Sequence, residues 1–160
     1  KVSVMTFNIF EMKCKYFNEF DKIVDKKPDI LLTQENGLFM GTENYSLINK
    51  CVHVGTYQNK MDINPKANFI HCINTPSYLA KSDSRQGVII EYNGISIANT
   101  HLEGGRVVDQ VIHTNFDGYM AHKLNILKQL IELNPDIICG DFNSYYDDEY
   151  NTDSSSFIHQ

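Results

Sequence analysis

The chain has 160 residues, a length that suits one domain with a single hydrophobic core. Apolar residues make up 42% and charged residues 21%, which is ordinary for a globular protein, and no stretch approaches the roughly 18 apolar residues of a membrane span. The net charge of −6 argues against a protein that grips nucleic acid over a broad basic face, although it leaves room for a local cationic groove.

The cysteines do not have the spacing of a zinc ribbon or a thioredoxin-type site, because none belongs to a C-x-x-C pair. They are Cys14, Cys51, Cys72 and Cys139. Cys139 lies in an apolar run, where a free thiol behaves as a small hydrophobic side chain. We therefore expect an intracellular, reducing compartment, and the sequence leaves two disulfides open.

The first elements alternate strand, helix and strand. The alternation VSVMTFNIF predicts a strand over residues 2–9. Apolar residues at helical spacing predict a helix over 17–24, which ends before Pro28. The run PDILLTQE then predicts a buried strand that finishes on Gln34 and Glu35.

The later elements become clearer after a difficult middle. Between about residues 37 and 81 the strand-like pieces are YSLI, CVHV and FIHCI. GVIIEY and ISIANTHL then predict two strands joined by a tight hairpin at Asn93 and Gly94. An amphipathic helix is predicted over 117–133, ended by Pro135, and DIICGDFN is the last predicted strand.

Four of the predicted strands end in polar side chains of the type that binds metals or phosphate. The two runs PDILLTQE and PDIICGDF echo each other, since each is a proline, a buried strand and then an acid. Ligands of α/β sheets gather where strands end at their carboxyl edge. The candidates are Asn8, Glu35, His101, and Asp141 with Asn143.

The acidic candidates each have a structural alternative. Glu35 ends a buried strand, where a carboxylate must be hydrogen-bonded, paired or metal-bound, or it is an exposed acid of the next loop. Asp141 and Asn143 share one face if the strand continues, and Gly140 would let backbone or ligand approach closely. The alternative is a turn, because G-D-x-N is good turn chemistry.

The remaining candidates are weaker when taken singly. His101 at a strand end is more often structural, Asn8 could begin a turn, and Arg85 in SDSRQG is by default a solvated loop charge. What favours a functional reading is their order, with each residue at or next to the end of a separate strand.

These motifs together resemble the endonuclease/exonuclease/phosphatase superfamily, which includes DNase I-like nucleases, abasic-site endonucleases, deadenylases, sphingomyelinases and inositol polyphosphate 5-phosphatases. The resemblance lies in TFNIF, PDILLTQE, NTHLEGG and GDFNS, with RQGVIIEY similar to the strand that follows the family's R-x-G segment, and it covers roughly residues 2–144. It implies an α/β fold, a four-layer αββα sandwich of two facing mixed sheets with helices outside. The chain, 1–160, would be a single such domain that lacks its C-terminal part.

The resemblance also implies a metal site. Asn8 and Glu35 would help to hold Mg²⁺, or Mn²⁺, with Glu35 as the principal ligand. Hard oxygen ligands in small number suit magnesium, which keeps several waters and binds substrate phosphate.

The other candidates receive roles in phosphoester hydrolysis by the same resemblance. Asp141 would orient or activate the attacking water, and Asn143 would contact the scissile phosphate or the metal. His101 would donate a hydrogen bond to a phosphate oxygen, and Arg85 is a secondary candidate for that task. Such hydrolysis needs preorganised donors and a base for water, which amide, imidazole and carboxylate supply.

The resulting hypothesis is a metal-dependent phosphoesterase, foremost a phosphodiesterase or nuclease whose phosphate-ester substrate is nucleic acid. An inositol phosphate or a lipid head group is the alternative substrate. A non-catalytic scaffold of the same fold is a second class of function, and a third reading makes GDFNS and QENG mere turns of an unrelated α/β protein.

The sequence departs from the family at its end. Members carry an S-D-H or D-H motif well after G-D-x-N, whereas here 17 residues follow Asn143, and His159 stands beside no aspartate. We expect the chain to be the N-terminal two-thirds of a longer protein, nearly inactive by itself.

Overall fold

The computed structural model describes residues 1–9, 25–37, 39–51, 53–61, 65–76, 84–102 and 109–143. Their elements in chain order are β1 (Val4–Asn8), β2 (Ile30–Gln34), β3 (Tyr45–Lys50), β4 (Val54–Asn59), β5 (Asn68–Pro76), β6 (Ser84–Tyr92), β7 (Ile95–His101), α2 (Asp109–Glu132) and β8 (Ile137–Asp141). The helix predicted over 17–24 and the candidate His159 lie outside the described residues. Among the described helices, none is long and apolar enough to cross a membrane.

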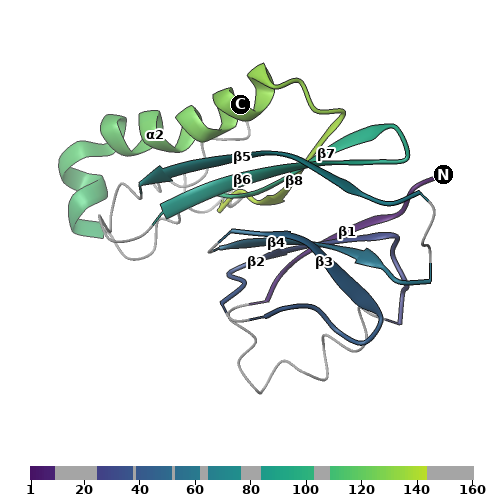
Figure 1. Ribbon diagram of the computed structural model, residues 1–160. Helices are drawn as coiled ribbons and strands as arrows, with labels where there is room; N and C mark the ends of the chain where they lie inside the picture. The colour runs from purple at the N-terminus through teal and green to yellow at the C-terminus, as the bar shows by residue number, and fades with distance from the viewer. Residues whose placement is uncertain are drawn as a thin grey trace.

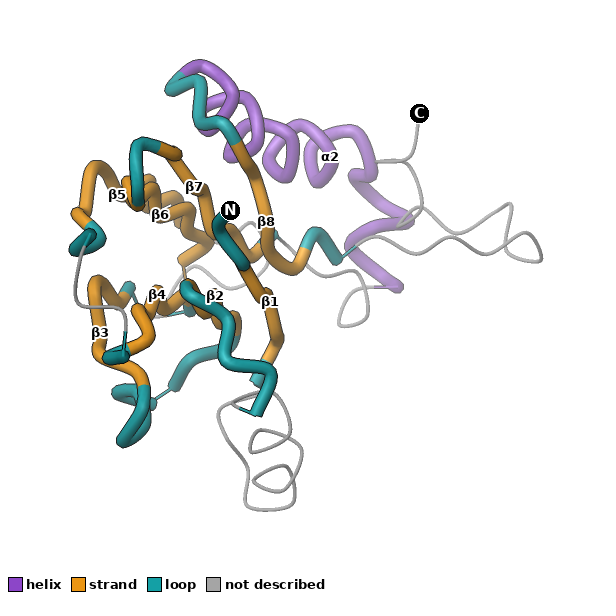
Figure 2. The backbone as a smooth tube through the Cα atoms, turned by 90° about the vertical axis from the view of Figure 1, so that its right-hand side faces the viewer, coloured by secondary structure: helices purple, strands orange, loops and turns teal. Residues whose placement is uncertain are grey.

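The strands form two four-stranded sheets that face each other (Figure 1). Sheet A has the order β1-β2-β4-β3 and sheet B the order β5-β6-β7-β8. Each sheet is mixed, as predicted, because β1–β2 and β7–β8 are parallel and the other neighbours are antiparallel. Helix α2 lies along the outer face of sheet B (Figures 1 and 2). The described residues thus form three layers, and the predicted four-layer arrangement stays a prediction.

The apolar residues of the central strands serve two layers at once. Ile30 and Leu32 of β2 pack in the core between the sheets, while Leu31 packs on the outer side of sheet A. This alternation follows from the period of two in a strand. The core between the sheets consists of Ile30, Leu32, Val54, Ala67, Val88, Ile90, Tyr92 and Ile97. A second core holds α2 on sheet B through Ile73, Ile89, Ala98, Leu102, Ile126 and Leu130.

The echo between the two PDI runs is a structural equivalence. In each, the aspartate accepts hydrogen bonds from both the backbone N–H and the hydroxyl of a serine at the start of the neighbouring parallel strand: Ser3 stands directly before β1, and Ser96 is the second residue of β7. Asp29 accepts from Ser3 at 2.6 and 2.8 Å, and Asp136 accepts from Ser96 at 2.8 and 2.7 Å. Each aspartate N–H donates back to the serine hydroxyl, at 3.0 and 2.9 Å. These two Ser–Asp pairs join the starts of β1 and β2, and of β7 and β8.

The predicted hairpin is confirmed. Tyr92 pairs with Ile95, and the two residues between them, Asn93 and Gly94, have φ of 54° and 73°. Positive φ at both central positions is the requirement of the tight hairpin turn that an Asn-Gly pair satisfies.

Two predicted starts of elements are wrong. Helix α2 begins at Asp109 and not at 117, because the apolar spacing continues through Ile112 and Phe116 and the helix tolerates Gly118. Strand β6 begins at Ser84, so Arg85 lies in a strand and not in a loop.

The piece CVHV is also misplaced. The strand there is β4, which starts only at Val54 and continues through GTYQN. Its polar residues are buried and hydrogen-bonded: Gln58 donates to the Pro65 carbonyl and accepts from the Ala67 N–H, both at 2.8 Å. A strand with buried amides lacks the apolar pattern on which the prediction relied. YSLI and FIHCI do lie within β3 and β5.

Candidate metal and phosphoester site

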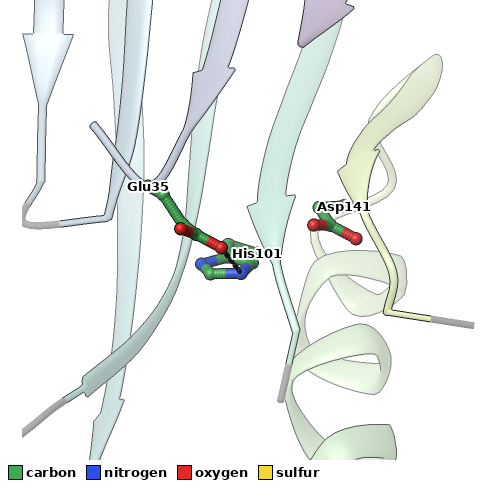
Figure 3. Close-up of side chains that lie close together, drawn as sticks. All are labelled: Glu35, His101 and Asp141. Carbon is green, nitrogen blue, oxygen red and sulfur yellow. Dashed lines mark ion pairs between the residues drawn. The ribbon is translucent and has the colours of Figure 1, made fainter. Parts of the chain in front are cut away.

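Side chains from both sheets meet at one end of the sandwich. Glu35 directly follows β2, His101 ends β7 and Asp141 ends β8, and all three point toward one another (Figure 3). The strands β1–β2 and β7–β8 are parallel pairs, so their carboxyl ends lie side by side. The structure therefore brings together residues that are up to 106 positions apart in the sequence, as Glu35 and Asp141 are.

The three side chains are close enough to share one ion. One ligand atom from each of Glu35, His101 and Asp141 lies within 4.8 Å of the other two. His101 Nε2 is 3.9 Å from Glu35 Oε1, and their side chains are 6% and 29% exposed. Two carboxylates and an imidazole could hold a divalent cation, because carboxylate oxygens suit Mg²⁺ and Mn²⁺ while imidazole suits transition metals.

Glu35 is neither a freely exposed loop acid nor a plain strand residue. Its φ is 48°, in the left-handed region that side chains other than glycine and asparagine rarely adopt. This conformation costs of order 1 kcal/mol and persists where the surroundings impose it, often at functional sites. It turns the chain at the end of β2.

Asn8, the last residue of β1, bridges the two carboxylates. Its Nδ2 donates to Glu35 Oε1 at 3.0 Å and to Asp141 Oδ2 at 2.8 Å. The predicted role of Asn8 as a metal ligand needs its Oδ1, since hard cations bind oxygen. A rotation of the terminal amide exchanges nitrogen and oxygen with little change of shape, and would present that oxygen to an ion.

The segment after β8 is a turn, so the expectation that Asp141 and Asn143 share one face of a continuing strand is wrong. The strand ends at Asp141, whose Oδ1 accepts the backbone N–H of Asn143 at 2.9 Å. Asn143 has φ of 48°, and its Nδ2 donates to the Leu102 carbonyl at 2.8 Å. The backbone of G-D-x-N thus forms the turn that was the alternative prediction. The side chain of Asp141 nevertheless points toward Glu35 and His101 (Figure 3).

Gly140 permits the close approach that its sequence position suggests. It is paired with Thr100 in the ladder between β7 and β8 and has φ of 142°. A Cβ at this position would overlap the Thr100 carbonyl. What comes close to Gly140 is thus the backbone of β7, which places Asp141 beside His101.

Lys123 is a buried cation that the sequence reading missed. It lies on α2, is fully buried, and donates from Nζ to the Asn143 carbonyl at 2.8 Å. Burying an ammonium group is costly unless it is hydrogen-bonded or paired, so this contact ties the helix to the turn after β8. The sequence does contain a signal for this burial, because Lys123 lies on the apolar face of the helix, three residues after Met120 and four before Leu127.

A second histidine lies next to the first. The ring centroids of His53 and His101 are 6.0 Å apart, with 60° between the ring planes. The His53 backbone N–H donates to Gln86 Oε1 at 3.0 Å, and Gln86 pairs with His101 in the sheet. His53 was missed because CVHV was read as a strand. The backbone of Arg85, the neighbour of Gln86, pairs with Thr75, and its side chain lies outside the description.

Two buried amides join the sheets just behind this end of the sandwich. Gln34 Nε2 donates to Asn99 Oδ1 at 2.7 Å and to Thr6 Oγ1 at 3.0 Å. Asn99 Nδ2 donates to the carbonyls of Thr33 and Gly55 at 3.2 and 3.0 Å. Because Gln34 precedes Glu35 and Asn99 lies two residues before His101, these bonds fix the spacing of the sheets at the site.

Comparison of the sequence with protein-family models gives no match, and comparison with curated proteins gives none either. Solved structures do match. TDP2 from D. rerio, complexed with a single-strand DNA product, has 14% identity and a TM-score of 0.58, over 91% of this chain and 62% of that one. The human Nocturnin catalytic domain with a bound sulfate anion has 17% identity and a TM-score of 0.56, over 90% and 64%. The 3′-5′ exonuclease NExo from Neisseria meningitidis has 15% identity and a TM-score of 0.58, over 89% and 58%.

The chain thus spans about six tenths of the length of these solved structures. All three belong to the superfamily that the motifs resemble. Over the matched residues this chain therefore has the fold of these solved structures, a mixed α/β fold of the DNase I-like type with two sheets.

Proposed function

We propose that this chain forms the site of a metal-dependent phosphoester hydrolase, foremost a phosphodiesterase or nuclease, in a domain of the four-layer type. The observation that carries the proposal is the group of two carboxylates and an imidazole within 4.8 Å, assembled from both sheets at the carboxyl ends of their parallel strands. A scaffold protein has no need to gather like charges at a sheet edge, where they repel each other.

The residues fit a divalent cation, for which we propose Mg²⁺ or Mn²⁺ with Glu35 and Asn8 as ligands and Asp141 close by. The two carboxylates share a single amide group of Asn8 between them. A cation bound there would neutralise charge on the non-bridging oxygens of a phosphate.

Asp141, His101 and Asn143 would act on the reacting groups. The two oxygens of Asp141 are held by the amide of Asn8 and the backbone N–H of Asn143, which fixes the carboxylate that would orient or activate water. His101 would donate to a phosphate oxygen. Asn143 uses one amide hydrogen on a carbonyl, and its second N–H and its oxygen are the groups that would reach phosphate or metal.

The solved structures that match and the net charge of the chain support one substrate class over the others. TDP2 has been solved with a single-strand DNA product, and NExo has been solved both as a 3′-5′ exonuclease and as a 3′ phosphatase bound to a product DNA hairpin. We propose a nucleic-acid phosphoester near a strand end, because few phosphate contacts are then needed and the net charge of −6 weakens binding to long duplexes. The same charge makes a small phosphate ester, such as an inositol phosphate, the second candidate.

Metal binding is tested first, by thermal unfolding with Mg²⁺ or Mn²⁺ against EDTA. Saturation at about 100 times Kd stabilises a protein by about 2.7 kcal/mol. Glu35→Gln should lose most of this metal-dependent shift, whereas the exposed Glu91→Gln on β6 should keep it. A full shift in Glu35→Gln would refute the site.

Hydrolysis is tested on the full-length protein with a single-stranded oligonucleotide, a duplex and an inositol phosphate. The proposal expects EDTA-sensitive cleavage that Asp141→Asn reduces by at least about 100-fold, the scale of a positioned base. Cleavage that Asp141→Asn leaves unchanged would contradict the assigned role.

A further inference from the structure

Two cysteines meet across the interface between the sheets. Cys51 follows β3 of sheet A, and Cys72 lies within β5 of sheet B. Their Sγ atoms are 2.7 Å apart, closer than two unbonded sulfur atoms normally pack, whereas a disulfide bond is about 2.05 Å long. Neither residue belongs to the candidate metal and phosphoester site.

Both cysteines are held in place by the sheets. The Cys51 N–H donates to the Val54 carbonyl at 2.9 Å, and Cys72 pairs with Val88 in the ladder between β5 and β6. Both side chains are half-buried and pack against the core between the sheets. Since sheet contacts on either side set the two backbones, joining the sulfurs asks for little movement of the chain.

We propose that Cys51 and Cys72 are the site of a reversible disulfide that cross-links sheet A to sheet B. The oxidant is a small-molecule disulfide such as oxidised glutathione. One cysteine thiol loses its proton and attacks that disulfide, which forms a mixed disulfide and releases one glutathione thiol. The second cysteine thiolate then attacks the mixed disulfide, the bond between Cys51 and Cys72 forms, and the second glutathione leaves as a thiol. Two protein thiols are oxidised and one glutathione disulfide is reduced.

Burial, and then the neighbouring Cys72 thiol, raise the pKa of Cys51 to about 12. The thiolate is the attacking species, so its population, and with it the rate of cross-linking through Cys51, rises about tenfold per pH unit below that value. Cross-linking that starts from Cys51 should therefore be slower at neutral pH than in alkaline solution.

The cross-link would fix Cys51 two positions before His53. His53 lies between β3 and β4, and its ring is 6.0 Å from the ring of His101 on the other sheet. Val54, the first residue of β4, pairs with Gln34 at the end of β2. The disulfide would thus close the sandwich at the end where the candidate site lies, whatever reaction the site performs.

The linkage is tested by incubating the folded protein in a series of reduced and oxidised glutathione mixtures, blocking the remaining thiols, and mapping tryptic peptides by mass. The four cysteines fall in four tryptic peptides, and Cys51 and Cys72 lie in residues 51–60 and 67–81. We expect these two peptides joined, with the protein lighter by two hydrogen atoms, in wild type and in the control Cys139→Ser. Cys51→Ser and Cys72→Ser should instead take up one glutathione. Equal pairing with Cys14 or Cys139, or no joined peptide at any ratio, would overturn the proposal.

Thermal unfolding of the wild-type protein gives a second readout that needs no variant to fold. Closing the loop from residue 51 to residue 72 should raise Tm by roughly 10 °C, reversed by a reductant. A Tm that is equal or lower in the oxidised protein would show that the bond strains the sheets, which contradicts a prepared pair.

Discussion

The buried amide of Asn99 joins the two sheets by hydrogen bonds. It makes three hydrogen bonds, one to the side chain of Gln34 and two to the carbonyls of Thr33 and Gly55, all inside sheet A. Asn99→Leu removes all three while leaving their partners buried. Each unmade bond to a buried group costs about 1–3 kcal/mol. Gln34 keeps Thr6 as a partner, so the sum is nearer the lower bound, at about 4 kcal/mol in total.

A loss of this size is a large share of the 5–15 kcal/mol that typically holds a domain folded. In urea unfolding, with a slope of about 2 kcal/mol per molar, the midpoint should fall by about 2 M at unchanged slope. The control is Asn68→Leu, an exposed position at the start of β5, which should stay within about 0.5 kcal/mol of wild type.

The double variant with Gln34→Leu sharpens the test. When both amide side chains are replaced by leucine, neither leaves the other with an unmade hydrogen bond. The loss of unfolding free energy in the double variant should therefore be smaller than the sum of the losses in the two single variants, by about 1 kcal/mol or more. If Asn99→Leu unfolds within about 1 kcal/mol of wild type, the reasoning that this amide joins the sheets is refuted.

Three further predictions concern single positions. Lys123→Met keeps the apolar stem of the side chain but removes the ammonium group that donates to the turn after β8. Calorimetric titration with Mn²⁺ should then show about tenfold weaker binding with the fold retained. Unchanged affinity for Mn²⁺ would show that Lys123 does not support the metal site. Gly140→Ala forces a Cβ onto the Thr100 carbonyl at a φ of 142°, so urea unfolding should show a loss above about 2 kcal/mol, and a neutral result would contradict the geometry. Hydrogen bonds from Ser96 lower the pKa of Asp136. The ionised carboxylate therefore contributes its full stability above the ordinary carboxyl range, and this contribution is lost as pH falls through the lowered pKa. Asp136→Asn should lack this loss when Tm is measured as a function of pH, and the same decrease of Tm in acid for both proteins would refute the role of Asp136.

The sequence predicted the strands that carry the candidate residues because the signals for those strands are local. PDILLTQE and PDIICGDF are apolar runs that end in acids, and the Asn-Gly pair specifies its hairpin without help from the rest of the chain. The order of strand ends then indicated which residues would meet, and Asn8, Glu35, His101 and Asp141 do lie together.

What the sequence did not reveal depends on contacts between distant segments. Strand β4 is buried although it is polar, because Gln58 finds partners in the segment that follows it, and no periodic pattern marks that. The backbone after Asp141 turns because Asn143 can adopt a left-handed conformation, an alternative that the sequence left open beside a continuing strand. Lys123 was not singled out in the sequence, and the packing of α2 on sheet B is what buries it.

The two Ser–Asp pairs have a consequence at the opposite end of their strands. In a parallel pair a slip by one position reverses the face on which every later side chain stands. The pairs tie Asp29 to Ser3 and Asp136 to Ser96 at the start, so five residues on Asn8 arrives opposite Gln34, and His101 opposite Asp141. The exposed Ser3 and the half-buried Ser96 thereby set the register of the two parallel pairs, so the alignment of the acidic side chains is decided at the opposite end of the strands that carry them.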